Sequence, residues 1–191
     1  SLGHIGYDEM YEGYCVSARG LIDGGADLFL IETAQDPLQI KAALHAITDT
    51  MATMNVKLPI MVSVTIELSG TMLIGTDAST IAAILEPFDI LSLGFNCGTG
   101  PEQVHKHIKT LSSVWGKPIS VHANAGLPQN RGGHSFYPMG PDEFATFEHD
   151  FTTIDGVSIV GGCCGTTPEH IAKLCQHVKD VKLKAQTGKH D

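Results

Sequence analysis

The chain has 191 residues, enough for one domain with a substantial core, and its formal net charge is -9. This acidic balance argues against nucleic acid or an anionic membrane as a partner, because both require clustered Lys and Arg. No apolar run approaches the roughly 20 residues that span a bilayer, and no signal-peptide pattern opens the chain. We therefore expect a cytoplasmic protein with a small-molecule ligand.

Strand-like apolar runs alternate with helical patterns along the chain. A helical pattern over residues 7–22 comes first. The predicted strands follow at residues 27–32, 59–66, 89–96, 118–123 and 156–161. Runs that are apolar nearly throughout are typical of parallel strands covered on both faces. Residues 40–47 and 104–115 repeat apolar side chains at helical spacing, so the sequence predicts a parallel sheet with right-handed βα crossovers.

Two architectures fit this order, an open doubly wound sheet and an eight-stranded barrel. Five strands cannot close a barrel, which usually takes about 250 residues, so length alone favours the open sheet. However, polar residues end alternate units, with Glu32 on the first, Cys97 on the third, and Cys163 and Cys164 on the fifth. Alternate barrel strands share one interior layer, so these side chains would converge at the carboxyl ends. We therefore predict that residues 1–191 form one partial (βα)8 domain, its last five units, with the first strands absent.

The cysteines suggest a metal site. Five cysteines, two of them adjacent, do not fit a secreted disulfide framework. Cys97 and Cys164 each open a Cys-Gly-Thr turn that leads to a Pro-Glu helix start. Three thiolates at strand ends suit zinc and leave its fourth position open. Adjacent side chains on a regular strand point to opposite faces, but the glycines that flank Cys163 and Cys164 allow an irregular backbone.

An open zinc position next to a carboxylate suggests the substrate. A free thiol with a pKa of roughly 8.5 is mostly protonated at neutral pH, whereas a zinc-bound thiol is ionised. Glu32 could accept hydrogen bonds from an ammonium group, so an amino acid with a side-chain thiol fits both groups. Alternatives remain open: the cysteines as packing residues or a redox pair, and Glu32 as a helix cap or ion-pair partner. We expect His122 to be structural, and Cys15 and Cys175 to be buried apolar residues.

Two segments resemble a known family. Residues 161–171 (GGCCGTTPEHI) resemble the zinc signature of the homocysteine S-methyltransferases, and Asn96-Cys97 followed by residues 100–102 resembles its upstream partner. Within that family, residues 30–33 (LIET) and 124–128 (NAGLP) are most similar to the homocysteine-binding module of cobalamin-dependent methionine synthases. The resemblance extends over essentially the whole chain.

This resemblance implies a zinc enzyme. Cys97, Cys163 and Cys164 would hold zinc, the sulfur of homocysteine would complete the tetrahedron, and Glu32 would hold the amino group. The methyl group would come from methylcobalamin and give methionine, with the cobalamin-binding and folate-binding domains elsewhere in the same polypeptide. Betaine or S-methylmethionine is the alternative donor, and a non-catalytic zinc or redox module is the alternative class.

One feature of the family has no counterpart. Its members open with a strand and an Asp-Gly turn whose acidic residue also helps to bind homocysteine, and nothing before Ser1 matches it. The missing strands would leave two sheet edges exposed. We therefore expect the isolated chain to be marginally stable or oligomeric.

Overall fold

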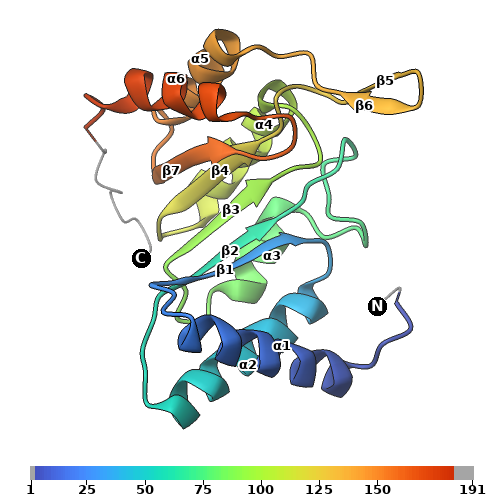
Figure 1. Cartoon of the computed structure of the whole chain (residues 1–191), viewed down its shortest axis with the longest axis vertical. Helices are drawn as coiled ribbons and strands as arrows, with labels where there is room; N and C mark the ends of the chain where they lie inside the picture. Colours follow the sequence, from blue (N-terminus) through green and yellow to red (C-terminus); the bar gives the residue numbers. More distant parts are fainter. Residues whose placement is uncertain (1–2, 183–191) are drawn as a thin grey trace.

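In the computed structural model, which describes residues 3–182, helices and parallel strands alternate (Figure 1). The helices are α1 (Tyr7–Asp23), α2 (Pro37–Met54), α3 (Ala78–Leu85), α4 (Pro101–Val114), α5 (Pro141–Phe151) and α6 (Pro168–Val178). The strands are β1 (Phe29–Ala34), β2 (Ile60–Val64), β3 (Ser92–Asn96), β4 (Ile119–Ala123), β5 (Gln129–Arg131), β6 (His134–Phe136) and β7 (Val157–Gly162). Among the helices within residues 3–182, none is long and apolar enough to cross a membrane.

Five parallel strands form the main sheet, in the order β1-β2-β3-β4-β7. In Figure 1, α3 and α4 lie behind the middle strands, while the near face of β2 and β3 has no described helix over it. A doubly wound sheet has helices on both faces, so this arrangement is that of a partial barrel. The predicted fold class is confirmed.

The two faces of the sheet differ in chemistry. Residues paired across parallel strands point to the same face, so the register sorts the side chains. The helix side carries the large apolar core, which includes Phe29, Ile31, Val62, Val64, Leu93, Phe95, Ile119 and Val121. The opposite face carries smaller and polar residues, in the paired rows Ser63-Gly94-Ser120 and Asn96-His122-Gly161. Hydrophobic burial therefore stabilises one side and leaves the other free for polar groups.

Helix starts follow the expected capping chemistry. Asp36 precedes Pro37, and its carboxylate accepts a 2.8 Å hydrogen bond from the backbone N–H of Leu38. Thr167 precedes Pro168 and forms a capping box with His170. Each cap satisfies N–H groups that the helix itself leaves unpaired, so the strand-to-helix turns at the carboxyl edge are well defined.

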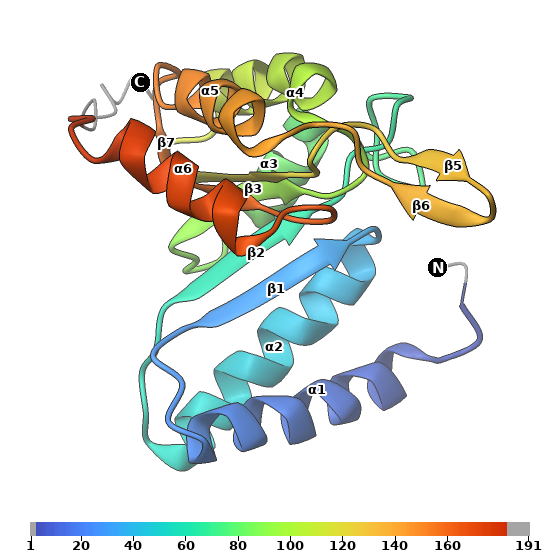
Figure 2. The ribbon, with the colours of Figure 1, turned by 45° about the horizontal axis from the view of Figure 1, so that its top comes forward.

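Two local features were not predicted from the sequence. Strand β1 runs two residues further than predicted, to Ala34, so Glu32 lies inside the strand rather than at its end. The connection over residues 124–141 contains the β5–β6 hairpin, which extends from the edge toward which the strand arrows point (Figure 2). Its strands are short, polar and exposed, so they lack apolar alternation. The Gly132-Gly133 pair, both at positive φ, was the available hairpin signal.

Helix α5 buries a carboxyl group. Glu148 is 0% exposed, and neither of its oxygens has a hydrogen-bond partner of ordinary geometry among the described residues. Burial raises the pKa of Glu148 well above its ordinary value of 4.5, and the nearby backbone of Ala123 offsets this only in part. The carboxyl group is therefore favoured in its neutral form.

We predict that Glu148→Gln flattens the pH dependence of folding stability. Because the folded pKa exceeds the unfolded value, the folded state binds more protons between the two, and the free energy of unfolding falls as the pH rises above about 4.5. Urea unfolding from pH 4.5 to 8 should show this fall in the unsubstituted chain and a smaller one in Glu148→Gln. The exposed Glu143→Gln, on the same helix, should keep the original slope. Equal slopes in all three proteins would contradict the assignment.

Candidate metal centre

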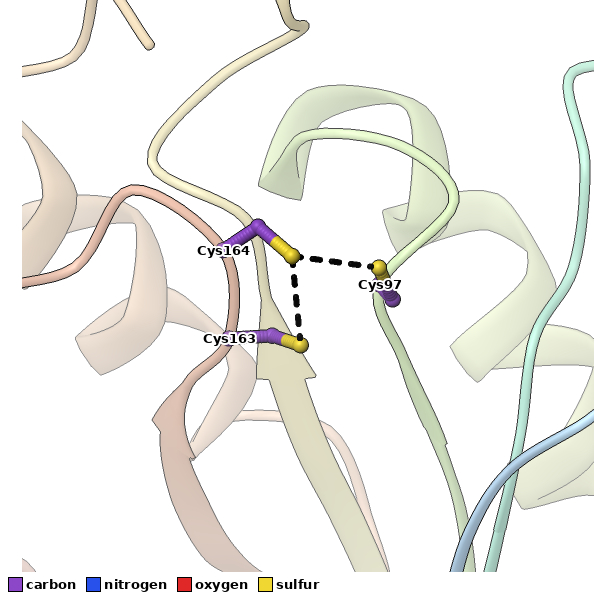
Figure 3. Close-up of side chains that lie close together, drawn as sticks. All are labelled: Cys97, Cys163 and Cys164. Carbon is purple, nitrogen blue, oxygen red and sulfur yellow. Dashed lines mark hydrogen bonds between the residues drawn. The ribbon is translucent and has the colours of Figure 1, made fainter. Parts of the chain in front are cut away.

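Three cysteine side chains meet at the carboxyl edge of the sheet. Cys97 follows β3, and Cys163 and Cys164 follow β7. The sulfur of Cys164 lies 3.6 Å from that of Cys97 and 4.0 Å from that of Cys163, and all three lie within 4.8 Å of one another. Figure 3 shows the three sulfurs pointing toward one another. The structure thus brings together the three residues singled out in the sequence.

The end of β4 holds both cysteine turns in place. Because β4 lies between β3 and β7, its backbone reaches the turns on both sides. The N–H of Cys97 donates to the carbonyl of His122, and the N–H of Cys163 donates to the carbonyl of Ala123. The side-chain oxygen of Asn124 accepts a 3.0 Å hydrogen bond from the N–H of Cys164. These bonds fix the cysteines relative to one another through the strand between them.

The backbone at these turns departs from strand geometry. Cys97 has a φ of 60°, in the left-handed region that few non-glycine residues adopt. Gly165 has a φ of 81°, and a Cβ atom there would overlap the side chain of Tyr137. Adjacent Cys163 and Cys164 therefore reach the same point because the chain turns sharply around them.

The sulfur spacing fits one tetrahedral metal ion. With zinc–sulfur bonds of about 2.3 Å, tetrahedral geometry separates neighbouring sulfurs by about 3.8 Å. The separations of 3.6 and 4.0 Å bracket that value, and the third pair of sulfurs lies within 4.8 Å. Both distances are far above the roughly 2.05 Å of a disulfide, and all three cysteines are free thiols. Three soft sulfur donors suit zinc.

Without a metal ion, the electrostatics of the cluster favour the neutral thiol of Cys163 over its thiolate. Burial raises the pKa of the Cys163 thiol to about 11; the neighbouring sulfurs add to this rise, while a hydrogen bond from Asn96 opposes it. Burial also raises the pKa of the Tyr137 hydroxyl, and a hydrogen bond with Cys164 is the second cause of that rise. A bound divalent cation reverses this preference, because it stabilises the thiolate form directly.

Glu32 and His122 lie on the sheet face that has no helix over it. Glu32 is exposed on β1, and His122 is half-buried on β4, where its ring packs against Gly161. Burial lowers the pKa of His122, and the charge of Glu32 partly opposes that shift. His122 does not belong to the group of potential metal ligands within residues 3–182.

The other two cysteines lie outside the cluster. Cys15 is half-buried on α1, with its sulfur 3.9 Å from the carbonyl of Ala46. Cys175 is exposed on α6, so the expectation that it is buried was wrong. Helical spacing alone did not show which face of α6 is buried. In the structure α6 packs on α5 and β7 through other residues, including Leu174.

Sequence reasoning missed three residues that contact the cysteines. Asn96 donates to the sulfur of Cys163, Asn124 holds the backbone of Cys164, and Tyr137 packs on the Gly165 turn. Asn96 carried a signal, because a buried amide in an otherwise apolar strand requires hydrogen-bond partners. Tyr137 carried none, since only the folded connection brings it to the cluster.

A partial (βα)8 barrel with three clustered thiols at its carboxyl edge, which could hold a metal ion, defines the class of protein. The family model for homocysteine S-methyltransferase matches residues 1–178, and the chain belongs to that family. It is 42% identical over 178 residues to methionine synthase of Mycobacterium leprae, and 40% identical over 182 residues to methionine synthase of Mycobacterium tuberculosis. These alignments cover 93% and 95% of this chain but 15% of each relative.

Solved structures agree on the fold. The homocysteine methyltransferase MmuM from Escherichia coli matches in its apo form with a TM-score of 0.71 and 23% identity, over 91% of this chain and 58% of that one. Its metallated form matches with the same TM-score and identity, over 52% of its length. At this identity the likeness concerns the barrel architecture, and the chain spans little more than half of this enzyme in either form.

We predict that Gly165→Ala destabilises the chain more than a matched strained glycine does. Gly25 also has a positive φ, but a Cβ atom there would meet open space, so Gly25→Ala should cost only the backbone strain, about 1–2 kcal/mol. Gly165→Ala should cost about 1–3 kcal/mol more, because the methyl group displaces Tyr137. Denaturant unfolding measures both. Equal losses would show that the Tyr137 contact contributes nothing.

Proposed function

We propose that the chain carries out the homocysteine step of methionine synthesis, in which a methyl group is transferred to a zinc-activated homocysteine thiolate. The observation that carries this proposal is the cluster of sulfurs from Cys97, Cys163 and Cys164, which lie within 4.8 Å of one another and of which two pairs are separated by 3.6 and 4.0 Å, close to the spacing around one zinc ion. Family membership and 40–42% identity to methionine synthases support homocysteine as the substrate. The fourth corner is then the place of the homocysteine sulfur.

Zinc held by the three thiolates would supply one chemical effect, the ionisation of a coordinated substrate thiol at neutral pH. The side chains of the protein must bind the ammonium group of the substrate. The carboxylate of Glu32, on the helix-free face of β1, accepts hydrogen bonds from the ammonium group of homocysteine. His122, whose pKa burial lowers, stays neutral on the same face and so does not repel that ammonium group. The substrate sulfur then forms a bond to the methyl carbon, and the electron pair of the broken bond stays with the donor.

Methylcobalamin is the proposed donor, supplied by another domain of the same polypeptide. The length of the relatives supports this, since the chain spans only 15% of the two methionine synthases. A folate-binding domain would remethylate the cobalamin. Betaine or S-methylmethionine as the donor receives less support, because the relatives at 40–42% identity are methionine synthases. A cytoplasmic location belongs to the same proposal.

We predict about one zinc per chain, bound through the three clustered sulfurs. Cys97→Ser and Cys164→Ser should each lose most of it, because the remaining sulfurs no longer complete three corners. Elemental analysis of the purified, dialysed chain measures the ratio. Cys175→Ser is the matched control and should keep the zinc, since its exposed sulfur lies on α6, outside the cluster.

The contrary result is a zinc-free wild-type chain, most clearly one that holds a Cys163–Cys164 disulfide. That outcome would favour a redox or assembly module over the proposed transferase.

We predict that Glu32→Gln weakens homocysteine binding without reducing zinc content. A hydrogen bond to a charged group contributes about 1.5–3 kcal/mol, so the dissociation constant should rise about 10-fold to 150-fold. Isothermal titration of the zinc-loaded chain with homocysteine measures this. Glu12→Gln, at an exposed position on α1, should bind as the unsubstituted chain does. Unchanged affinity in Glu32→Gln would remove Glu32 from the site.

A further inference from the structure

The side chain of Asn96 connects three strands to the cysteine cluster. Asn96 ends β3 immediately before Cys97 and is 3% exposed. Its Oδ1 accepts hydrogen bonds from the backbone N–H of Thr33 on β1 at 3.0 Å and from the hydroxyl of Ser63 on β2 at 2.7 Å. Its Nδ2 donates to Oγ1 of Thr33 at 2.8 Å and to Sγ of Cys163 at 3.7 Å. A single buried amide therefore contacts β1, β2 and the turn after β7.

These contacts fix which way the amide points. The backbone N–H of Thr33 can only donate, so the atom of Asn96 that faces it must be the oxygen. The two N–H groups then face the hydroxyl of Thr33 and the sulfur of Cys163. Two donors and two acceptor sites are thus all occupied, and a hydrogen is directed at the sulfur.

The same amide also holds a strained residue. Thr33 has a φ of 56°, in the left-handed region, which is rare for a β-branched residue. Both its backbone N–H and its hydroxyl bond to Asn96. Thr33 directly follows Glu32 within β1, so Asn96 holds the residue next to the proposed ammonium-binding carboxylate.

We propose that Asn96 is a positioning residue, which orients the Cys163 sulfur for metal binding through its N–H group and ties the end of β1 to the metal centre. Its N–H group bonds to one lone pair of the Cys163 sulfur, so the remaining lone pairs stay available to the metal. Partners of metal ligands typically change metal affinity 10-fold to 100-fold when substituted. This inference rests on the proposed function, in which Cys163 binds zinc.

The test separates the contact with the sulfur from the contacts with β1. Asn96→Asp keeps an acceptor for Thr33 and Ser63 but places a carboxylate oxygen, without a proton, toward Cys163. Thr33→Val is the matched control, because it removes the hydroxyl that receives one N–H and leaves the other on the sulfur. Asn96→Ala removes every side-chain contact without adding charge, and it serves if Asn96→Asp does not fold. Far-UV circular dichroism establishes folding of each 191-residue chain.

Zinc affinity is measured by competition with a chromogenic chelator. We expect zinc binding about 10-fold to 100-fold weaker for Asn96→Asp, a similar loss for Asn96→Ala, and a change within about threefold for Thr33→Val. With Co²⁺ in place of zinc, the sulfur-to-metal charge-transfer absorption should weaken in Asn96→Asp and stay unchanged in Thr33→Val.

Two results would overturn the inference. One is zinc affinity within about threefold of wild type in the folded Asn96 variants. The other is an equal loss in Thr33→Val, which would assign the effect to the end of β1 rather than to the sulfur. A wild-type chain that binds no zinc is a separate outcome, which overturns the proposed function itself.

Discussion

The site depends on the parallel register of β3, β4 and β7. Cys97 and Cys164 are 67 positions apart in the chain, yet their sulfurs lie 3.6 Å apart because the two strands flank β4 and end at the same edge. Backbone N–H groups of both cysteine turns bond to the end of β4. A slip of β4 by one residue would face its side chains the other way and separate the turns. The geometry of the sulfurs is thus a consequence of strand pairing.

The division between the faces of the sheet connects stability with function. The apolar core lies between the strands and the helices, so burial there stabilises the chain without using the opposite face. That face carries Asn96, His122 and Glu32 close to the carboxyl edge. Its edge strands β1 and β7 pair on one side only within the described part of the chain. The clustered cysteines therefore lie at the edge of a face that carries polar and charged side chains.

Much of the fold could be predicted from the sequence, because the apolar pattern and the residues that mark helix starts indicate the same elements along the chain. The five main strands fall within two or three residues of their predicted bounds at each end, and the proline-marked helix starts are present. The convergence of the three cysteines followed from the alternation of strands in a barrel. The contacts of Asn96 and Tyr137 did not, because they join residues distant in the chain and depend on left-handed backbone at Thr33 and Cys97. Neither local propensity nor periodicity encodes such turns.

The central claim is that the three clustered cysteines bind one zinc ion whose fourth position accepts homocysteine. X-ray absorption at the zinc edge counts sulfur ligands directly, with and without homocysteine. We expect three sulfurs at about 2.3 Å and one lighter ligand in the free chain, and four sulfurs after homocysteine is added. A sulfur count that stays at three with saturating homocysteine, or a chain that binds no zinc, would contradict the claim.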